Sequence, residues 1–123
     1  MEKISTTKAP MAIGPYSQAI KAGGFVFCSG QIAIDPKMNE FKPGTIIQET
    51  TRVIENLKAV LEQANSGLEK TIKVTVYLSN IDNFTEMNKV YEKYFLNKPS
   101  RSTIEVSKLP KGAKVEIDAI AET

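Results

Sequence analysis

A chain of 123 residues is long enough for one compact hydrophobic core and too short for two, so residues 1–123 are expected to form a single domain. Its composition, 41% hydrophobic and 24% charged, is that of an ordinary globular protein and argues against disordered and fibrous classes. The formal net charge of +2 comes from lysines scattered along the chain, which gives no indication of a nucleic-acid or membrane partner.

Scarce residue types restrict the chemistry further. Cys28 is the single cysteine, which excludes an intramolecular disulfide, and without histidine neither a zinc nor a haem site is expected. Only Arg52 and Arg101 could bind a carboxylate through a planar guanidinium. The N-terminus lacks the apolar core of a signal peptide and no apolar stretch could span a bilayer, so the reducing cytoplasm is the expected location.

The first thirty residues have the pattern of three short strands. Runs of β-branched and aromatic residues bounded by turn residues favour strands of this length. The expected strands are residues 2–6, 18–22 and 25–28. Gly23-Gly24 supplies a tight turn between the last two, so the chain should begin as a β-meander.

A helix is expected next, over about residues 46–65, after a loop between Asp35-Pro36 and Pro43-Gly44. Residues 45–48 have the form of a capping box, and Ser66-Gly67 is a stop signal. Apolar residues recur at spacings of three, four and seven: Ile47, Ile54, Leu57, Leu61 and Ala64. The opposite stripe carries Glu, Lys and Gln, so one face of this helix should cover the core.

The second half predicts a strand, a helix and two strands. In the first strand Ile72, Val74, Val76 and Leu78 alternate with Thr71, Lys73, Thr75 and Tyr77. Asp82 is the expected cap of the second helix, which ends before Pro99. Five apolar residues share one side of that helix: Phe84, Met87, Tyr91, Tyr94 and Phe95. The last two strands are expected near 102–107 and 113–121, separated by a turn at 109–112.

The order β-β-β-α-β-α-β-β indicates an α+β domain in which two amphipathic helices cover one face of a six-stranded sheet. On the last strand, Lys114, Glu116, Asp118 and Ile120 should point away from the helices. That face is neither fully apolar nor fully polar. It fits a sheet packed against copies of itself in a symmetric oligomer, and it fits a solvent-facing sheet equally well.

Arg101 and Glu116 are the first candidates for chemistry. Arg101 follows Pro99-Ser100, where the chain leaves the second helix, and could direct its guanidinium into a cleft; a surface ion pair is the alternative. Glu116 interrupts an apolar strand, so a partly desolvated carboxylate that exchanges protons near neutral pH is one interpretation, and a Glu on the wet side of the strand is the other. Asp118 lies on the same side, and the pattern does not choose between them.

Three further positions could line a site. Asn88 borders the apolar stripe of the second helix and needs a hydrogen-bond partner, either structural or in a site. Residues 14–19 form a loop that could present Tyr16 to a ligand or simply cap the core. Ser29-Gly30-Gln31 offers a hydroxyl and backbone N–H groups at a strand end, as anion sites and ordinary turns both do. Cys28 is most simply a buried apolar residue.

Five of these segments, in order, resemble the signatures of the RidA (YjgF) family over about residues 6–121: Gly14-Pro15-Tyr16-Ser17-Gln18-Ala19, Ser29-Gly30-Gln31, Asn88 with Tyr91, Pro99-Ser100-Arg101-Ser102, and Leu109-Pro110 with Val115-Glu116-Ile117. The resemblance implies a chorismate-mutase-like fold with a mixed sheet, assembled as a homotrimeric barrel with clefts between subunits. It also implies hydrolysis of 2-iminopropanoate and 2-iminobutanoate, released by pyridoxal-phosphate enzymes such as threonine dehydratase, to 2-keto acids and ammonia.

The resemblance also implies roles for individual residues. Arg101 would hold the substrate carboxylate and Glu116 would position or activate water, while Tyr16, Ser29, Gly30 and Asn88 would help to build the pocket. Ser100 replaces a common alanine, a small change that should not move Arg101. Thr103 takes the position of a common cysteine, so we expect a substrate-binding residue there and no thiol chemistry.

Chemistry and resemblance lead to one hypothesis. A protonated imine is already electrophilic, so holding the carboxylate and a water in place would suffice, and no cofactor or metal is expected. Two alternatives remain at this point. One is a non-catalytic ligand-binding or protein-interaction module that uses the same clefts. The other is a ribonuclease or translation inhibitor, against which the near-neutral charge and the absence of histidine argue.

Overall fold

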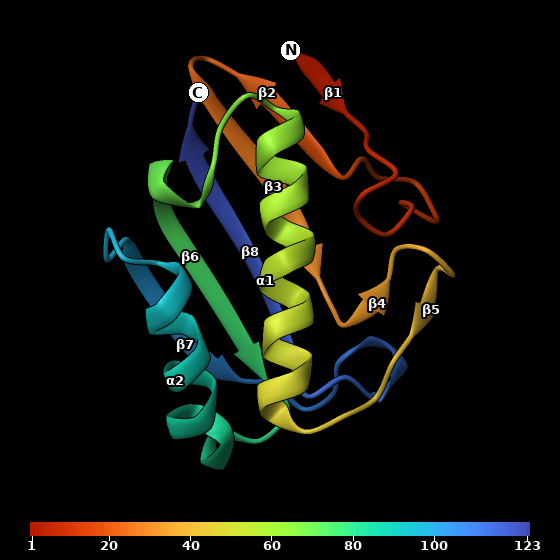
Figure 1. The fold of residues 1–123 in the computed structure, drawn as a ribbon, viewed down its shortest axis with the longest axis vertical. Coiled ribbons are helices and arrows are strands. Elements are labelled where there is room, and N and C mark those ends of the chain that lie inside the picture. Colours follow the sequence, from red (N-terminus) through yellow and green to blue (C-terminus); the bar gives the residue numbers. More distant parts are fainter.

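The computed structural model describes all of residues 1–123 and has the predicted α+β fold (Figure 1). The strands are β1 (Glu2–Ile4), β2 (Ala19–Ala22), β3 (Phe25–Gln31), β4 (Ile34–Asp35), β5 (Glu40–Phe41), β6 (Thr71–Leu78), β7 (Ser100–Glu105) and β8 (Val115–Glu122). The α-helices are α1 (Ile46–Gln63) and α2 (Phe84–Tyr94), and the short 3₁₀ helices are η1 (Leu68–Lys70), η2 (Ile81–Asn83) and η3 (Pro110–Gly112).

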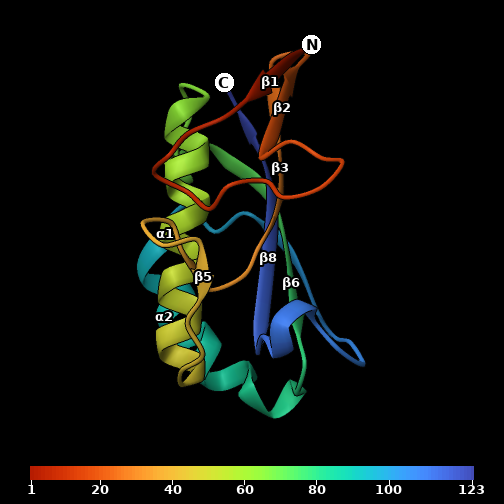
Figure 2. The same ribbon diagram turned by 90° about the vertical axis from the view of Figure 1, so that its right-hand side faces the viewer.

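Six strands form one sheet in the order β1-β2-β3-β8-β6-β7. Only β6 and β7 run parallel, so the sheet is mixed. Both helices lie on the same face, to the left of the sheet in Figure 2, which confirms the predicted two-layer arrangement. The core lies between these layers, and the other face of the sheet is open. Neither helix is long and apolar enough to cross a membrane.

The start of α1 agrees with the capping box. Thr45 Oγ1 accepts from the Gln48 backbone N–H at 3.1 Å, and Gln48 Oε1 accepts from the Thr45 N–H at 2.9 Å. The predicted stripe is confirmed except at Ile47, which is exposed, because the buried stripe enters the first turn through Ile46 and Glu49 instead. Glu49 therefore lies in the buried stripe and not in the opposite stripe of Glu, Lys and Gln.

The segment predicted as a loop after β3 contains the small β4–β5 hairpin. Asn56 of α1 holds the start of this hairpin in place. The buried side-chain amide of Asn56 donates to the carbonyl of Ile32 at 3.3 Å and to that of Ile34 at 2.9 Å. The amide therefore ties the start of the hairpin to α1 through two backbone carbonyls, of which that of Ile32 also accepts from the Ile34 N–H at 2.8 Å.

β6 departs from simple alternation at its start. Val74, Val76 and Leu78 face the helices as predicted, whereas Ile72 is exposed and Thr71 is buried. The register against β8 shifts between Thr71 and Lys73. An extra residue at such a bulge turns the preceding side chains to the opposite faces, which explains the error at the first two positions.

The second helix begins differently from the prediction. Asn80, rather than Asp82, is the cap: its Oδ1 accepts from the Asp82 N–H at 2.9 Å and opens the short helix η2, which leads directly into α2. Sequence alone favoured the Asp because a 3₁₀ turn before the helix was not expected. The strand after α2 starts at residue 100, two residues earlier than predicted, so Arg101 lies within β7 rather than ahead of it.

The open face of the sheet carries an apolar row. Glu116, Asp118 and Ile120 of β8 point to this face, as predicted, while the residues between them are buried under the helices. Ile120 pairs with Phe27, which pairs with Ile20 on the other side. The Phe27 side chain is 45% exposed. Apolar side chains gathered in this way on a surface are typical of an interface with another protein.

Candidate functional site

Arg101 reaches from β7 to one side of α2. It pairs with the buried Val74 of β6, so its side chain lies on the helix-covered face. Nη1 donates a hydrogen bond to Asn88 Oδ1 at 2.7 Å, and Cζ lies 4.5 Å from the centroid of the Tyr91 ring and 5.5 Å from that of Phe84. These three α2 residues, spaced by four and three, hold the guanidinium from one helix face.

In this arrangement the Arg101 guanidinium still has free N–H donors that could bind an anion. Arg101 is only partly exposed, and no carboxylate of the chain pairs with it, so the alternative of a surface ion pair does not apply. A guanidinium has five N–H donors, and the bond to Asn88 uses only one. A cavity of about 420 Å³ opens beside it, lined in part by Tyr91, Phe95 and Pro99. A small carboxylate could therefore enter and find several donors.

Two buried hydroxyls near Arg101 have no hydrogen-bond partner. They are the hydroxyls of Tyr91 and Thr103. Thr103 lies two residues beyond Arg101 on β7 and therefore on the same face. Burial raises the pKa of Tyr91, an effect that the positive charge of Arg101 opposes. Both hydroxyls are thus buried beside Arg101 without a hydrogen-bond partner of good geometry in the single chain.

Glu116 belongs to a different part of the surface. It lies on the open face of the sheet, where its carboxylate lies against Gly30 of β3. The register between β3 and β8 shifts here, between Cys28 and Gln31. A Cβ atom at position 30 would overlap Glu116 Oε2, so the absence of a side chain at Gly30 is what lets the carboxylate occupy this place.

The Glu116 carboxylate lines a cavity of about 310 Å³ together with Tyr16, Gly30, Pro110 and Lys111. Burial raises the pKa of Glu116, and the negative charge of Asp118 raises it further. The structure also separates these two acids, because Asp118 does not line this cavity and instead accepts a hydrogen bond from the Tyr77 hydroxyl at 3.0 Å. Of these two acids, Glu116 is therefore the one whose carboxylate lies in the cavity, with its pKa raised.

Ser29 and Gln18 support the loop that carries Tyr16. The Ser29 hydroxyl donates to the Ser17 carbonyl at 2.6 Å, so Ser29 braces the loop. The buried Gln18 amide accepts from the Thr6 N–H at 2.7 Å and donates to the Pro10 carbonyl at 2.7 Å. Gln18 has no role in the sequence analysis, although a glutamine at the start of an apolar strand is a signal of a buried polar contact.

The predicted site residues thus fall into two groups. Arg101, Asn88 and Thr103 form the Arg101 half-site at the β7 edge, on the helix-covered face. Glu116, with Tyr16 and Gly30, forms the Glu116 half-site on the open face, braced by Ser29. β6 separates β7 from β8, and two strand spacings are roughly 10 Å. One chain therefore does not bring Arg101 and Glu116 together.

Two other expectations concern sulfur and metals. Cys28 is buried, and burial with a contribution from Asp118 raises the pKa of its thiol to about 12, so the thiol stays protonated as an apolar core residue. No group of three or more His, Cys, Asp or Glu side chains is gathered where a metal ion could be held. Buried, unpaired hydroxyls and one guanidinium instead suit a small organic anion.

Comparison with known proteins gives a consistent assignment. The family model described as Endoribonuclease L-PSP matches residues 6–123. A RutC family protein of Pyrococcus abyssi is 54% identical over 121 residues, which is 98% of this chain and 95% of the relative. RidA from an Antarctic Psychrobacter species superimposes with a TM-score of 0.95 at 37% identity, covering 100% of both chains. Escherichia coli TdcF, solved with bound serine, has a TM-score of 0.94 at 37% identity and covers 100% of this chain and 99% of TdcF. The chain therefore belongs to the L-PSP (YjgF) family, the family of the Rid proteins.

Proposed function

We propose that this protein is a deaminase that hydrolyses 2-iminopropanoate and 2-iminobutanoate to 2-keto acids and ammonia. The observation that carries the proposal is that one chain offers both groups the reaction needs, a guanidinium with unused donors at Arg101 and a partly desolvated carboxylate at Glu116, on different faces of the sheet. The relatives support it, since one is named RidA and another binds serine, a small amino acid close in size to these imines.

The residues supply each part of the reaction. Arg101 binds the substrate carboxylate, and Glu116 accepts a proton from a water as its oxygen adds to the carbon of the protonated imine. The product of this step is a carbinolamine. The proton then passes from Glu116 to the nitrogen, and as the carbon–nitrogen bond breaks the Glu116 carboxylate takes the proton of the carbinolamine hydroxyl, which leaves the 2-keto acid. Glu116 then passes this proton to the released ammonia and regains its carboxylate form. One water is consumed and no redox step occurs, so no cofactor takes part.

We further propose that the complete site lies between two copies of the chain in a homotrimer. Arg101 and Glu116 lie on opposite faces, so a second copy is needed to bring one to the other. A head-to-tail contact between unlike patches closes into a ring, and three copies would give three equal sites. The row of the exposed Phe27 and the partly buried Ile20 and Ile120 supplies apolar surface for such packing.

A coupled assay tests the activity. Threonine dehydratase and threonine would generate the four-carbon imine, and 2-oxobutanoate would be followed with the wild-type protein present in trace amount. We expect the protein to accelerate formation of the keto acid in proportion to its concentration, with many turnovers per chain. The same preparation should leave single-stranded RNA intact. A rate equal to that without the protein would reject the deaminase and favour a binding module, and RNA cleavage would favour a nuclease.

A further inference from the structure

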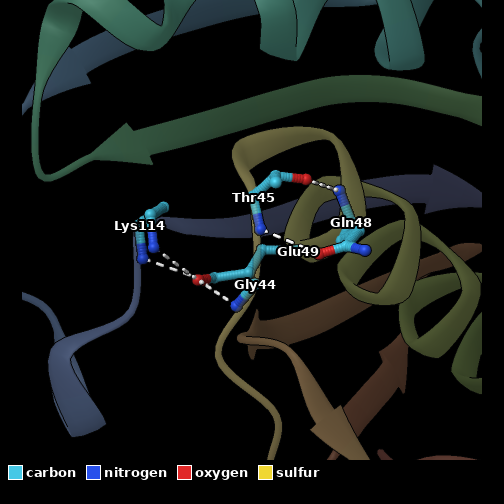
Figure 3. A network of polar contacts seen from close by, with 5 residues as sticks. All are labelled: Gly44, Thr45, Gln48, Glu49 and Lys114. Carbon is cyan, nitrogen blue, oxygen red and sulfur yellow. Dashed lines mark hydrogen bonds and ion pairs between the residues drawn. The ribbon is translucent and has the colours of Figure 1, made fainter.

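Glu49, in the first turn of α1, has a carboxylate that is buried away from both half-sites. Its side chain is 0% exposed. As Figure 3 shows, the carboxylate bridges the start of α1 to the start of β8. Oε1 accepts from the Lys114 backbone N–H at 2.9 Å, while Oε2 lies 3.4 Å from the Gly44 N and 3.5 Å from Lys114 Nζ.

A buried carboxylate is retained only when donors compensate for its loss of water. Here the backbone N–H groups of Gly44 and Lys114 and the Lys114 ammonium do so, and these two residues come from segments far apart in the sequence. An apolar residue could fill the same space in the core and would leave both N–H groups without a partner. Glu49 is therefore placed to hold a backbone segment, and that segment is the chain around Lys114.

Lys114 is held on both sides of its peptide unit. Its N–H donates to Glu49, and its carbonyl accepts from the Ser79 N–H at 3.2 Å. Glu116 follows two residues later on the same strand. On the other side, Lys111 and Gly112 adopt left-handed conformations, with φ of 61° and 70°, in the turn that lines the Glu116 cavity. In the sequence, Lys114 thus lies between the turn that lines the cavity and Glu116, whose carboxylate lies in that cavity.

We propose that Glu49 is a positioning residue of the Glu116 half-site. It fixes the point at which β8 begins, and so sets both the Glu116 carboxylate and the turn that encloses it. The expected effect of Glu49 on the reaction rate rests on the proposed deaminase function, whereas its effect on the position of Glu116 does not. Glu49 has no contact with the cavity, so it acts only through the backbone of residues 110–116.

The variant Glu49→Gln tests this with little change in shape. The amide keeps one acceptor oxygen and loses the ion pair and the second acceptor. Glu62→Gln is the matched control, because Glu62 is an exposed residue of the same helix. The charged and titratable groups around Glu116 are Asp118 and Tyr77 from the sheet, Lys111 from the turn and Tyr16 from the loop before β2, and neither variant alters them. Circular dichroism would establish that both variants are folded at the assay temperature.

The first readout is the titration of the Glu116 side-chain carbon by NMR, assigned by its loss in Glu116→Gln. If residues 110–116 loosen in Glu49→Gln, water reaches Glu116 and its pKa falls toward that of an ordinary glutamate; amide exchange over 110–116 should quicken. The second readout is kinetic: kcat should fall about 10-fold with KM changed less than about twofold, because Arg101 still binds the substrate.

The outcomes separate the two proposals. A shifted titration with faster exchange supports the positioning role, even if the wild type fails to hydrolyse imines, in which case only the deaminase proposal falls. Wild-type titration and exchange in Glu49→Gln would overturn the positioning role whatever the activity. An equal pKa shift in Glu62→Gln would also overturn it, because the effect would then belong to any loss of charge on α1.

Discussion

Replacing Arg101 with alanine is expected to lower kcat/KM for 2-iminobutanoate about 100-fold, the equivalent of about 3 kcal/mol. The guanidinium is held between Asn88 and Tyr91 with most of its donors unused, and alanine removes all of its charge-assisted bonds to the substrate carboxylate. The measurement is initial rates of 2-oxobutanoate formation in the coupled assay across a range of imine fluxes.

Two variants make this result specific. Arg52→Ala removes the only other arginine, which is exposed on α1, and should leave kcat/KM unchanged. Arg101→Lys keeps the charge but loses the planar fork and should recover only part of the activity. A fully active Arg101→Ala variant, or an equal loss in Arg52→Ala, would contradict the assigned role of Arg101.

Glu116→Gln is expected to lower kcat about 1000-fold with little change in KM, because the neutral amide cannot accept a proton from water. Asp118→Asn is the control, since it removes an acid from the same face of β8 whose partner is Tyr77 rather than the cavity. The wild-type rate should fall as pH drops through the raised pKa of Glu116. Equal losses in both variants would indicate that the charge of the whole face matters, and not Glu116 itself.

The same substitution should slightly stabilise the protein at neutral pH. The pKa of Glu116 is raised in the folded state by burial, so the folded state binds this proton more tightly than the unfolded state does. Stability is therefore lost as pH rises from the ordinary value of 4.5 through the raised pKa. Glu116→Gln removes that cost, and because the side chain is only partly buried the gain should be on the order of a degree or two in Tm. The gain should vanish in acid, and thermal melts at the two pH values check it.

The sequence predicted the fold best where local signals are strong. The capping box at Thr45 and the apolar periodicity of α1 are properties of neighbouring residues, and they survive in the structure. The predictions were wrong where the structure of a segment depends on residues that are distant in the sequence. The bulge at the start of β6 depends on pairing with β8, and Glu49 is buried because Lys114 and Gly44 meet it from elsewhere in the chain. No local pattern contains those partners.

The site was predictable in composition but not in arrangement. The residue pattern made Arg101 and Glu116 candidates and left Asp118 as an alternative, and the family resemblance favoured the first two. Alternation along β8 placed Glu116 on the open face. The face of Arg101 could not be read in the same way, because it depends on where β7 begins and on its parallel pairing with β6. The aromatic contact between Arg101 and Tyr91 also depends on that pairing, so the apolar pattern of the second helix predicts only a core position for Tyr91.

The central claim, a site shared by two copies, is tested by mixing the two inactive chains. Arg101→Ala and Glu116→Gln subunits would be co-expressed with different tags, and oligomers that carry both tags would be purified. Each mixed trimer has one junction at which an intact Arg101 meets an intact Glu116, so about one third of wild-type activity should return. Mixed oligomers no more active than the two separate variants would contradict the account.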